Sequence, residues 1–373
     1  MSAITVTSVA SGSDVKRFIK FVWQIYQDDP HWVPPLLMDR RKLMDKKNNP
    51  FYKHAEAEFF LAYRDAQIVG RIAAIVNHHH NKEHNENIGF FGFFECINDQ
   101  SVADALFEKA VGWLKERGVH AVRGPATPSV NDEYGLLVDG FDKPAVVLMP
   151  YNPPYYGALI EKVGFRKIKD LYSYHLSQDN AVSERLERMA NVIKQREGLT
   201  FRSLNMSDFE NEVNRIKTLY NRAWVYNWGA VQMTDEEFAA LAKDLKPVVV
   251  PDLVILAEYK GEPIGFSLSL PDLNIALKHN KNGYLLPGLY CMMKYKKKID
   301  TVRIIVLGVV RERQKTGAAS VLFYETAKRA NTLGYKYGDA GWVLDDNVMM
   351  NRSAEFLNGK RYKTYRLYEM PIT

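Results

Sequence analysis

The chain has 373 residues, with 50 Lys and Arg against 44 Asp and Glu, so its formal net charge is +6. This length favours about two domains, and 46% hydrophobic with 25% charged residues is typical of a globular protein. The charge is mild and forms no long basic stripe, which argues against a nucleic-acid partner.

The two cysteines, Cys96 and Cys291, lie far apart in the sequence and form no metal or redox motif. They fit a reducing compartment, so we expect a cytoplasmic protein. The first residues lack the basic start and apolar core of a secretion signal. Because no apolar run approaches about 18 residues, we expect no stable membrane insertion. We expect a monomer or a homodimer.

The first half of the chain begins with a strand, a polar turn and a second strand around residues 61–70. A further strand at 88–97, a helix at 102–117 and a strand near 119–123 follow. The histidine-rich stretch 77–84 between them is polar and lacks a complete ligand set, so we interpret it as a solvated loop and predict no metal. A tyrosine-rich strand at 169–176 ends this half.

An insertion at 124–156 is rich in Pro, Asn, Asp and Tyr. Long ordered loops in compact domains tend to be functional. Its residues Asn131, Asp132 and Tyr134 are therefore candidates to bind a polar acceptor, although the insertion could equally form a wall for the partner domain.

The second half repeats the pattern of the first. Residues 256–265 align without gaps on 61–70, and strand, helix and strand follow again at 302–310, 317–333 and 335–341. A tyrosine-rich strand closes this half too. The repeat is too long for a solenoid and fits duplication of a whole domain. We predict domains at 1–178 and 199–373, joined by a linker helix within 179–198.

Two segments of the second half leave alternatives open. Asp272 and Asn274 are candidate acceptor-binding residues, or they hold a turn through their side chains. The insertion 280–300 carries the basic cluster Lys294–Lys298, which reads as a solvated surface or as attraction to a phosphate or an anionic lipid surface. Its apolar residues would either hold a long acyl chain or cover the core.

The stretch 301–333 is the most informative. A buried, β-branched strand runs into a short polar loop, and the loop opens an amphipathic helix. A helix N-terminus offers free backbone N–H groups and the positive end of the helix dipole, which suits a pyrophosphate. The small residues Gly317 and Ala319 would let phosphate oxygens approach the backbone. The loop residues concerned are Gln314, Lys315, Thr316, Gly317, Ala318 and Ala319.

The spacing Gln314-x-x-Gly317-x-Ala319 resembles the pyrophosphate loop of the GNAT superfamily of acyl-CoA-dependent N-acyltransferases. With the repeat, nearly the whole chain resembles a tandem GNAT protein of a bacterial GNAT-like family. Three segments, at 124–135, 271–277 and 342–350, carry that likeness. It implies an α/β (α+β) fold of two tandem GNAT-like domains. Each would be a mixed, mostly antiparallel twisted sheet flanked by helices, with a splayed central strand.

The resemblance also implies where acetyl-CoA or a longer acyl-CoA would bind. The first-half segment 96–103 has no glycine and carries Asp99, whose charge would repel phosphate, so we expect the cofactor in the second half. There the backbone of Leu307 and Val309 would pair with the pantetheine arm and supply an oxyanion donor. Asn347 would contact the arm or cap the following helix.

The implied reaction is acyl transfer to a small or lipid-like amine, which must lose a proton. Glu258 is a candidate base, or merely a charge on a strand's exposed face. Many superfamily members protonate the leaving thiolate with a Tyr four residues before a Gly. Counting back from Gly359 gives Glu355 instead, so Tyr362 or Tyr365 would have to substitute. The alternatives are a catalytically silent acyl-CoA-binding scaffold and a tRNA-dependent aminoacyl transferase.

Overall fold

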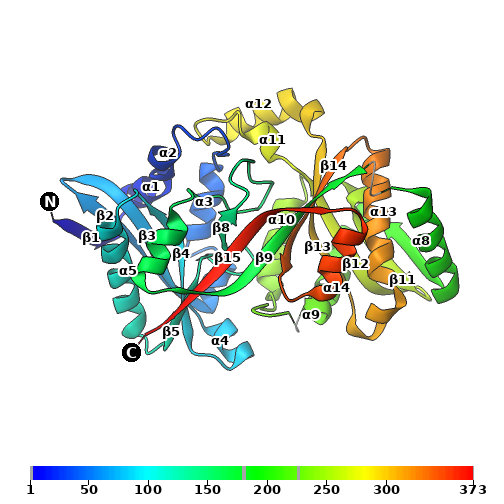
Figure 1. Cartoon of the computed structure of the whole chain (residues 1–373), viewed down its shortest axis with the longest axis horizontal. Helices are drawn as coiled ribbons and strands as arrows, with labels where there is room; N and C mark the ends of the chain where they lie inside the picture. The colour runs from blue at the N-terminus through cyan, green and yellow to red at the C-terminus, as the bar shows by residue number, and fades with distance from the viewer. Residues whose placement is uncertain (1–2, 179–181, 225–226, 373) are drawn as a thin grey trace. The chain divides into compact units, whose positions relative to one another are not determined.

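A computed structural model describes residues 3–178, 182–224 and 227–372 (Figure 1). The chain divides into two compact units. Unit 1 consists of Met1–Asp170, Ala276–Lys294 and Lys363–Thr373, and unit 2 consists of Leu171–Ile275 and Tyr295–Tyr362. The predicted boundaries at 178 and 199 follow the sequence, whereas each unit gathers separate stretches of it. Residues 179–181 of the predicted linker lie outside the described residues.

The sheet of unit 1 has the strand order β1-β2-β3-β4-β5-β15, with β8 also paired to β15. Its neighbours are antiparallel except β4 and β5, which are parallel. The strands are β1 (Ile4–Ser8), β2 (Ala55–Arg64), β3 (Gln67–Asn77), β4 (Ile88–Cys96), β5 (Ala121–Gly124), β8 (Leu136–Asp139) and β15 (Lys360–Pro371), and a separate pair is formed by β6 (Ala126–Thr127) and β7 (Glu133–Tyr134).

The helix α5 (Gln100–Lys115) packs on β2 and β3. Its buried residues recur at helical spacing and face Phe91, Phe94 and Phe165 in a largely aromatic core. The other helices of this unit are α1 (Gly12–Lys20), α2 (Val22–Ile25), α3 (Leu37–Met44), α4 (His78–His84), α6 (Tyr156–Val163) and, from the insertion after β12, α12 (Leu285–Tyr295).

The histidine-rich stretch is helical, so its interpretation as a solvated loop was wrong. Asn77 caps α4 by accepting a hydrogen bond from His80 N at 3.1 Å. His80 is buried, and its Nε2 lies 2.9 Å from Glu86 Oε2. Burial lowers the pKa of His80 to about 4. The polar composition of this stretch suggested a loop, although its residues form a helix that turns one histidine, His80, toward the core.

The sheet of unit 2 repeats this plan with the strand order β9-β14-β13-β12-β11-β10. The neighbours are antiparallel except β13 and β14, which are parallel. The strands are β9 (Arg166–Ser177), β10 (Leu199–Ser203), β11 (Val254–Tyr259), β12 (Glu262–Pro271), β13 (Thr301–Val309) and β14 (Tyr337–Leu344).

Two helices of unit 2, α9 (Phe209–Trp224) and α13 (Ala318–Thr332), cover opposite faces of this sheet. Successive side chains of a strand point to opposite faces. On β12, Phe266 contacts Trp224 of α9, while the next residue, Ser267, accepts a hydrogen bond from Thr326 of α13. The remaining helices are α8 (Glu184–Glu197), which packs on α13, α10 (Asp235–Leu245), α11 (Asn274–Leu277), which extends into unit 1, and α14 (Val348–Phe356).

The last strand of each half of the sequence belongs to the unit built mainly from the other half. From Leu171 onward, β9 pairs with β14 in unit 2. From Lys363 onward, β15 pairs with β5 in unit 1. The architecture confirms the predicted α/β fold, in which each unit contributes mixed, mostly antiparallel strands flanked by helices. Across the described residues, no helix has both the length and the apolar character needed to cross a bilayer.

Candidate functional site

The central parallel strands of unit 2 separate part of the way along. Pairing between β13 and β14 runs from Thr301↔Tyr337 to Ile304↔Ala340. From Ile305 to Val309, β13 continues beside β12, while β14 continues beside β9 to Leu344. Among the described residues, therefore, no strand pairs with the edge of β13 that faces β14 over the second half of β13. This is the predicted splayed central strand.

A bulge lies where the strands part. Leu268 pairs with Val306 but Ser269 pairs with Ile304, so Ile305 is an extra residue in β13. A bulge bends a strand and redirects its backbone groups. Next to this point, a Cβ on Gly341 would lie 1.9 Å from Ser173 Oγ. Ser173 is fully buried, and its hydroxyl has no hydrogen-bond partner within the described part of the chain. A buried hydroxyl therefore lies beside the glycine of β14 next to the point where the strands part.

The loop after β13 ends at a position whose backbone conformation is easily adopted only by a residue without a Cβ, and that residue is a glycine. Gly317 has φ +84°, and α13 begins at the next residue with no side-chain cap. Gln314 Nε2 donates to Val309 O at 3.4 Å, and Thr316 Oγ1 donates to Arg313 O at 2.7 Å. Ala318 N donates to Thr316 Oγ1 at a long 3.3 Å, and Lys315 is exposed. Apart from this long bond, the N-cap residue provides no side-chain cap and the helix N-terminus is flanked by a cation, which suits an anion.

The matching helix of unit 1 begins differently. Asp99 is the N-cap of α5, and its carboxylate accepts from Ser101 N at 2.9 Å. Arg64 Nη2 pairs with the same carboxylate at 2.8 Å. The hydrogen bond from Ser101, followed by that from Arg64, lowers the pKa of Asp99 below 3.8. The chain's own anion therefore occupies this helix N-terminus.

The strand edge of unit 1 is also occupied. Phe93 N donates to Thr127 Oγ1 at 3.1 Å, and Ala126 O lies 1.9 Å from the position of a Cβ on Gly92. Farther along, Cys96 N donates to Tyr156 Oη at 2.9 Å, and Tyr155 Oη donates to Cys96 O at 2.8 Å. The edge of β4 that corresponds to the open edge of β13 is filled by β6 and by two tyrosines.

Asp99→Asn should lower the stability of the protein at neutral pH but not in acid. Because Asn is also a good N-cap residue, the decrease in the free energy of unfolding reflects the lost negative charge alone, on the order of 0.5–1 kcal/mol. A lowered folded-state pKa means that this stability is present above pH 3.8 and is lost as the pH falls below it. We expect a thermal midpoint about 1–4 °C lower at pH 7, and no difference at strongly acidic pH. Glu108→Gln, on the exposed side of α5, is the control. An equal loss at both pH values would contradict the charge argument.

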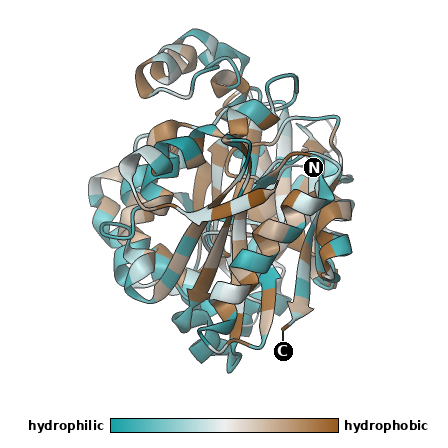
Figure 2. Ribbon diagram, turned by 90° about the vertical axis from the view of Figure 1, so that its left-hand side faces the viewer, coloured by the Kyte–Doolittle hydropathy of each residue, from teal (hydrophilic) through white to brown (hydrophobic). Residues whose placement is uncertain are grey.

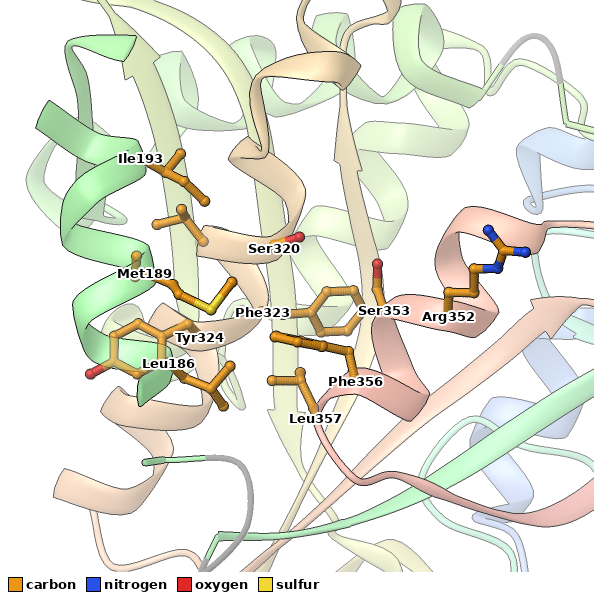
Figure 3. Close-up of a pocket in the computed structure, with 12 residues that line it drawn as sticks. Leu186, Met189, Ile193, Ser320, Phe323, Tyr324, Arg352, Ser353, Phe356 and Leu357 are labelled. Carbon is orange, nitrogen blue, oxygen red and sulfur yellow. The ribbon is translucent and has the colours of Figure 1, made fainter. Parts of the chain in front are cut away.

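A mainly apolar cavity of about 250 Å³ lies between α8, α13 and α14 of unit 2. In Figure 3, Leu186, Met189 and Ile193 extend from α8 toward α13, and Phe323 lies between α13 and Ser353 of α14, while Arg352 points away. Ser320 of the first turn of α13 also lines it. A Cβ on Gly317 would lie 3.1 Å from Ile193 Cδ1. The cavity therefore adjoins the Gly317 loop.

A buried polar cluster lies one residue before the point where the strands part. Arg303, Asp339 and His175 are paired in register across β13, β14 and β9, so their side chains share a face of the sheet. Tyr362 Oη donates to Asp339 Oδ2 at 2.8 Å, and Arg303 Nε lies 3.8 Å from Asp339 Oδ1. The ring of His175 lies 5.8 Å from that of Tyr362.

Of the predicted catalytic residues, only Tyr362 lies in this cluster. Glu258 of β11 is held at 2.7 Å by Arg202, which also pairs with Glu212 at 2.9 Å. That network fits a structural role for Glu258. Tyr365 is fully buried in unit 1, where its strand pairs with β8.

The remaining predicted polar residues mostly hold turns and caps. Asp272 Oδ1 accepts from Asn274 N at 3.2 Å in the turn after β12. Asn347 caps α14 by accepting from Met350 N at 3.2 Å. In unit 1, Asn131 N donates to Ser129 Oγ at 3.1 Å, Asp132 Oδ2 accepts from the same hydroxyl at 2.6 Å, and Tyr134 is buried in β7.

The structure also adds a tyrosine that sequence reasoning missed. Tyr174 of β9 pairs with Ala340 and donates its hydroxyl to Asn351 of α14 at 2.9 Å. Burial, and then the charge of Glu355, raise the pKa of Tyr174, so it stays protonated at neutral pH. Glu355 stands where the superfamily often has a tyrosine. The missed signal was the tyrosine-rich strand of the first half, because nothing in the sequence says that this strand joins unit 2.

Comparisons with known proteins agree with the fold. The tandem GNAT protein from the clavulanic acid biosynthesis pathway superposes with a TM-score of 0.57 at 11% identity, over 99% of this chain and 98% of its own. A GCN5-related N-acetyltransferase from Sphaerobacter thermophilus superposes with a TM-score of 0.53 at 13% identity, over 99% of this chain and 95% of its own. At such identities the likeness shows the fold alone.

No family model matches the chain, but two relatives match over its full length. "Protein YghO" of Escherichia coli (strain K12) is 33% identical over 98% of this chain and 95% of its own length. "Bacterial ceramide synthase" of Caulobacter vibrioides (strain NA1000 / CB15N) is 36% identical over 99% of this chain and 98% of its own length. The chain therefore belongs to the family of these two relatives, and its fold is that of the tandem GNAT proteins.

Proposed function

We propose that the protein is an acyl-CoA-dependent N-acyltransferase of the cytoplasm, with the CoA site in unit 2. The observation that carries the proposal is the difference between the two units. In unit 2 an open strand edge runs into an uncapped helix N-terminus at Gly317. In unit 1 the same edge is filled and the same helix position holds Asp99. Two copies of one fold thus differ at the two places where a pyrophosphate and an extended arm would bind.

The residues of unit 2 fit this co-substrate chemically. Gly317, Ala318 and Ala319 would receive the pyrophosphate on backbone N–H groups, with Lys315 as a nearby cation. The backbone from Ile305 to Val309 would hold the extended arm. The apolar cavity beside Gly317 is smaller than the ~300 Å³ usual for a small-molecule pocket, so it would hold part of a ligand.

An acyl-CoA would supply an activated thioester, and the chain would supply the proton transfers. We assign His175 as the group that accepts the proton of the attacking amine, because histidine is the commonest general base in enzymes and its ring lies 5.8 Å from that of Tyr362. Asp339 and Tyr362 would orient it from the same cluster. On the opposite face, the hydroxyl of Tyr174 would protonate the leaving sulfur.

A relative named bacterial ceramide synthase, at 36% identity, supports our proposal for the acceptor class. A ceramide is an N-acylated long-chain amino alcohol, so we propose a lipid-like amine of this class as acceptor and a long-chain acyl-CoA as donor. Asn131, Asp132 and Tyr134 in unit 1, and Asp272 and Asn274 in unit 2, stay predictions for acceptor binding. The turn-holding bonds of the first two and the last two, and the burial of Tyr134, are sufficient for a structural role.

Thermal-shift measurements with CoA, acetyl-CoA and palmitoyl-CoA test the proposal, followed by transfer assays with a long-chain amino alcohol. A ligand at about 100 times its dissociation constant should stabilise the fold by roughly 2.7 kcal/mol, a shift of a few degrees. We expect palmitoyl-CoA to give the larger shift and to be consumed only when the amine is present. No shift with any of the three would contradict the proposal.

The second candidate is a silent acyl-CoA-binding protein. The observation in its favour is the exposed Glu355 at the position where the superfamily often has its tyrosine. This candidate predicts the same thermal shifts without any release of CoA from palmitoyl-CoA across a panel of amines.

A further inference from the structure

The helix α12 of unit 1 is apolar on the face that it turns to solvent. Gly288 and Cys291 form its buried face, at the spacing of one helical turn. On the other side Leu286 and Met293 are 77% and 80% exposed. A helix that is apolar all round is normally buried in a core or a membrane. The exposed apolar residues of this face are Tyr284, Leu285, Leu286, Leu289, Tyr290 and Met293.

This apolar face cannot simply fold back onto unit 1, because the helix is fixed from its buried side. Leu37 N donates to Gly283 O at 2.9 Å, and Trp23 Nε1 donates to Lys281 O at 2.7 Å. Gly283 has φ +70° and is so tightly packed that a Cβ would lie 2.6 Å from Pro35 O. The remainder of unit 1 therefore presents α12 outward in a defined orientation.

The segment around α12 carries the whole net charge of the protein. Between Asp272 and Asp300 there is no acidic residue and there are six lysines. Without these six the chain would have 44 basic and 44 acidic residues. The last four lysines are exposed and follow the apolar face directly along the chain. The six are Lys278, Lys281, Lys294, Lys296, Lys297 and Lys298.

We propose that α12 docks the protein on an anionic lipid bilayer, with its apolar face in the headgroup boundary, and that Lys294 and the lysines next to the helix along the chain bind the lipid phosphates. Apolar side chains beside a basic cluster are the pattern of helices that lie in a membrane interface. The 11 residues of α12 extend about 16 Å, too short to span a hydrocarbon core of about 30 Å. A second copy of the chain is a poor occupant, because it would bring its own six lysines to the same face.

Flotation of the full-length protein with vesicles tests this proposal, and it needs no turnover. Phosphatidylcholine vesicles containing phosphatidylglycerol should carry the protein, and pure phosphatidylcholine vesicles should carry much less. High salt should release it, because exposed charges are screened. Leu286→Asp with Met293→Asp should lower binding at least tenfold. A variant in which four lysines are replaced by Glu should not bind, because each lysine removed lowers the affinity for the vesicles roughly fivefold. The four are Lys294, Lys296, Lys297 and Lys298.

Matched controls separate this surface from general effects. Val192→Asp with Leu241→Asp changes two exposed apolar residues on other helices. A second control replaces four exposed lysines elsewhere by Glu and so changes the net charge by the same amount; these are Lys109, Lys115, Lys162 and Lys243. Both controls should float better than their α12 counterparts. The proposal is overturned if the α12 variants float like wild type, if neutral vesicles bind equally well, or if the apolar variant only converts a dimer to a monomer.

Discussion

Gly317→Glu is expected to abolish the thermal shifts produced by acetyl-CoA and palmitoyl-CoA. The substitution places a carboxylate at the uncapped start of α13, where the helix dipole and free N–H groups would receive a pyrophosphate. It also puts a side chain at φ +84°, with its Cβ 3.1 Å from Ile193 Cδ1. That conformation costs about 1–3 kcal/mol, so the unliganded variant should melt several degrees lower yet remain folded.

Two further variants separate charge from strain. Gly317→Gln has nearly the same size and strain without the charge, so it should keep part of the shift. Gly334→Glu puts the same residue at φ +89° after the other end of α13, where nothing lies within 4 Å of the new Cβ. It should melt lower and bind CoA normally. A wild-type shift in Gly317→Glu would place the CoA site elsewhere.

His175→Gln is expected to lower the turnover number by about 10²–10⁴-fold, the usual contribution of a general base. The affinity for CoA should stay unchanged, because His175 lies on the sheet face opposite α13 and away from the Gly317 loop. A group that must accept a proton in the reaction makes the rate depend on pH, so the wild-type rate should show such a dependence. The variant should lose that dependence, and a residue with a purely structural role would not alter it.

Tyr362→Phe is the companion measurement, made with an acceptor that the wild type acylates. It removes the hydroxyl that donates to Asp339 Oδ2 and should destabilise the protein by about 1–3 kcal/mol. Because the imidazole remains, turnover should fall less and keep its pH dependence. If His175→Gln kept the wild-type pH profile, the proton would leave by another route, and Tyr174→Phe would then be the next variant.

The geometry of the loop at Gly317, which we propose binds the pyrophosphate, is the part of the candidate site that could be predicted best from sequence. It depends on local features: a buried strand, a glycine able to adopt positive φ, and a helix that starts without a side-chain cap. The prediction that the first half does not bind phosphate also rested on one residue, Asp99. Its role as an N-cap explains why that charge is there at all.

The polar residues around the opening of the strands could not be predicted in this way. His175 and Tyr174 belong to a strand that ends the first half of the sequence, yet they join unit 2 beside β14. Glu258 has a carboxylate that could act as a general base, but in the structure this carboxylate is paired with Arg202. Neither the exchange of strands nor the ion pair leaves a trace in local spacing, because each depends on partners more than 50 residues away.

The sequence by itself determined that two similar α/β halves follow one another, and which half keeps a glycine at the start of its central helix. Those properties depend on periodicity, composition and backbone freedom, which are set by residues close together in the sequence. Only the tertiary structure decided that the edge of β4 is filled by Thr127 and Tyr156 while the edge of β13 stays open. Only it turned the apolar face of α12 outward. Which groups meet, and which remain exposed, depends on long-range packing.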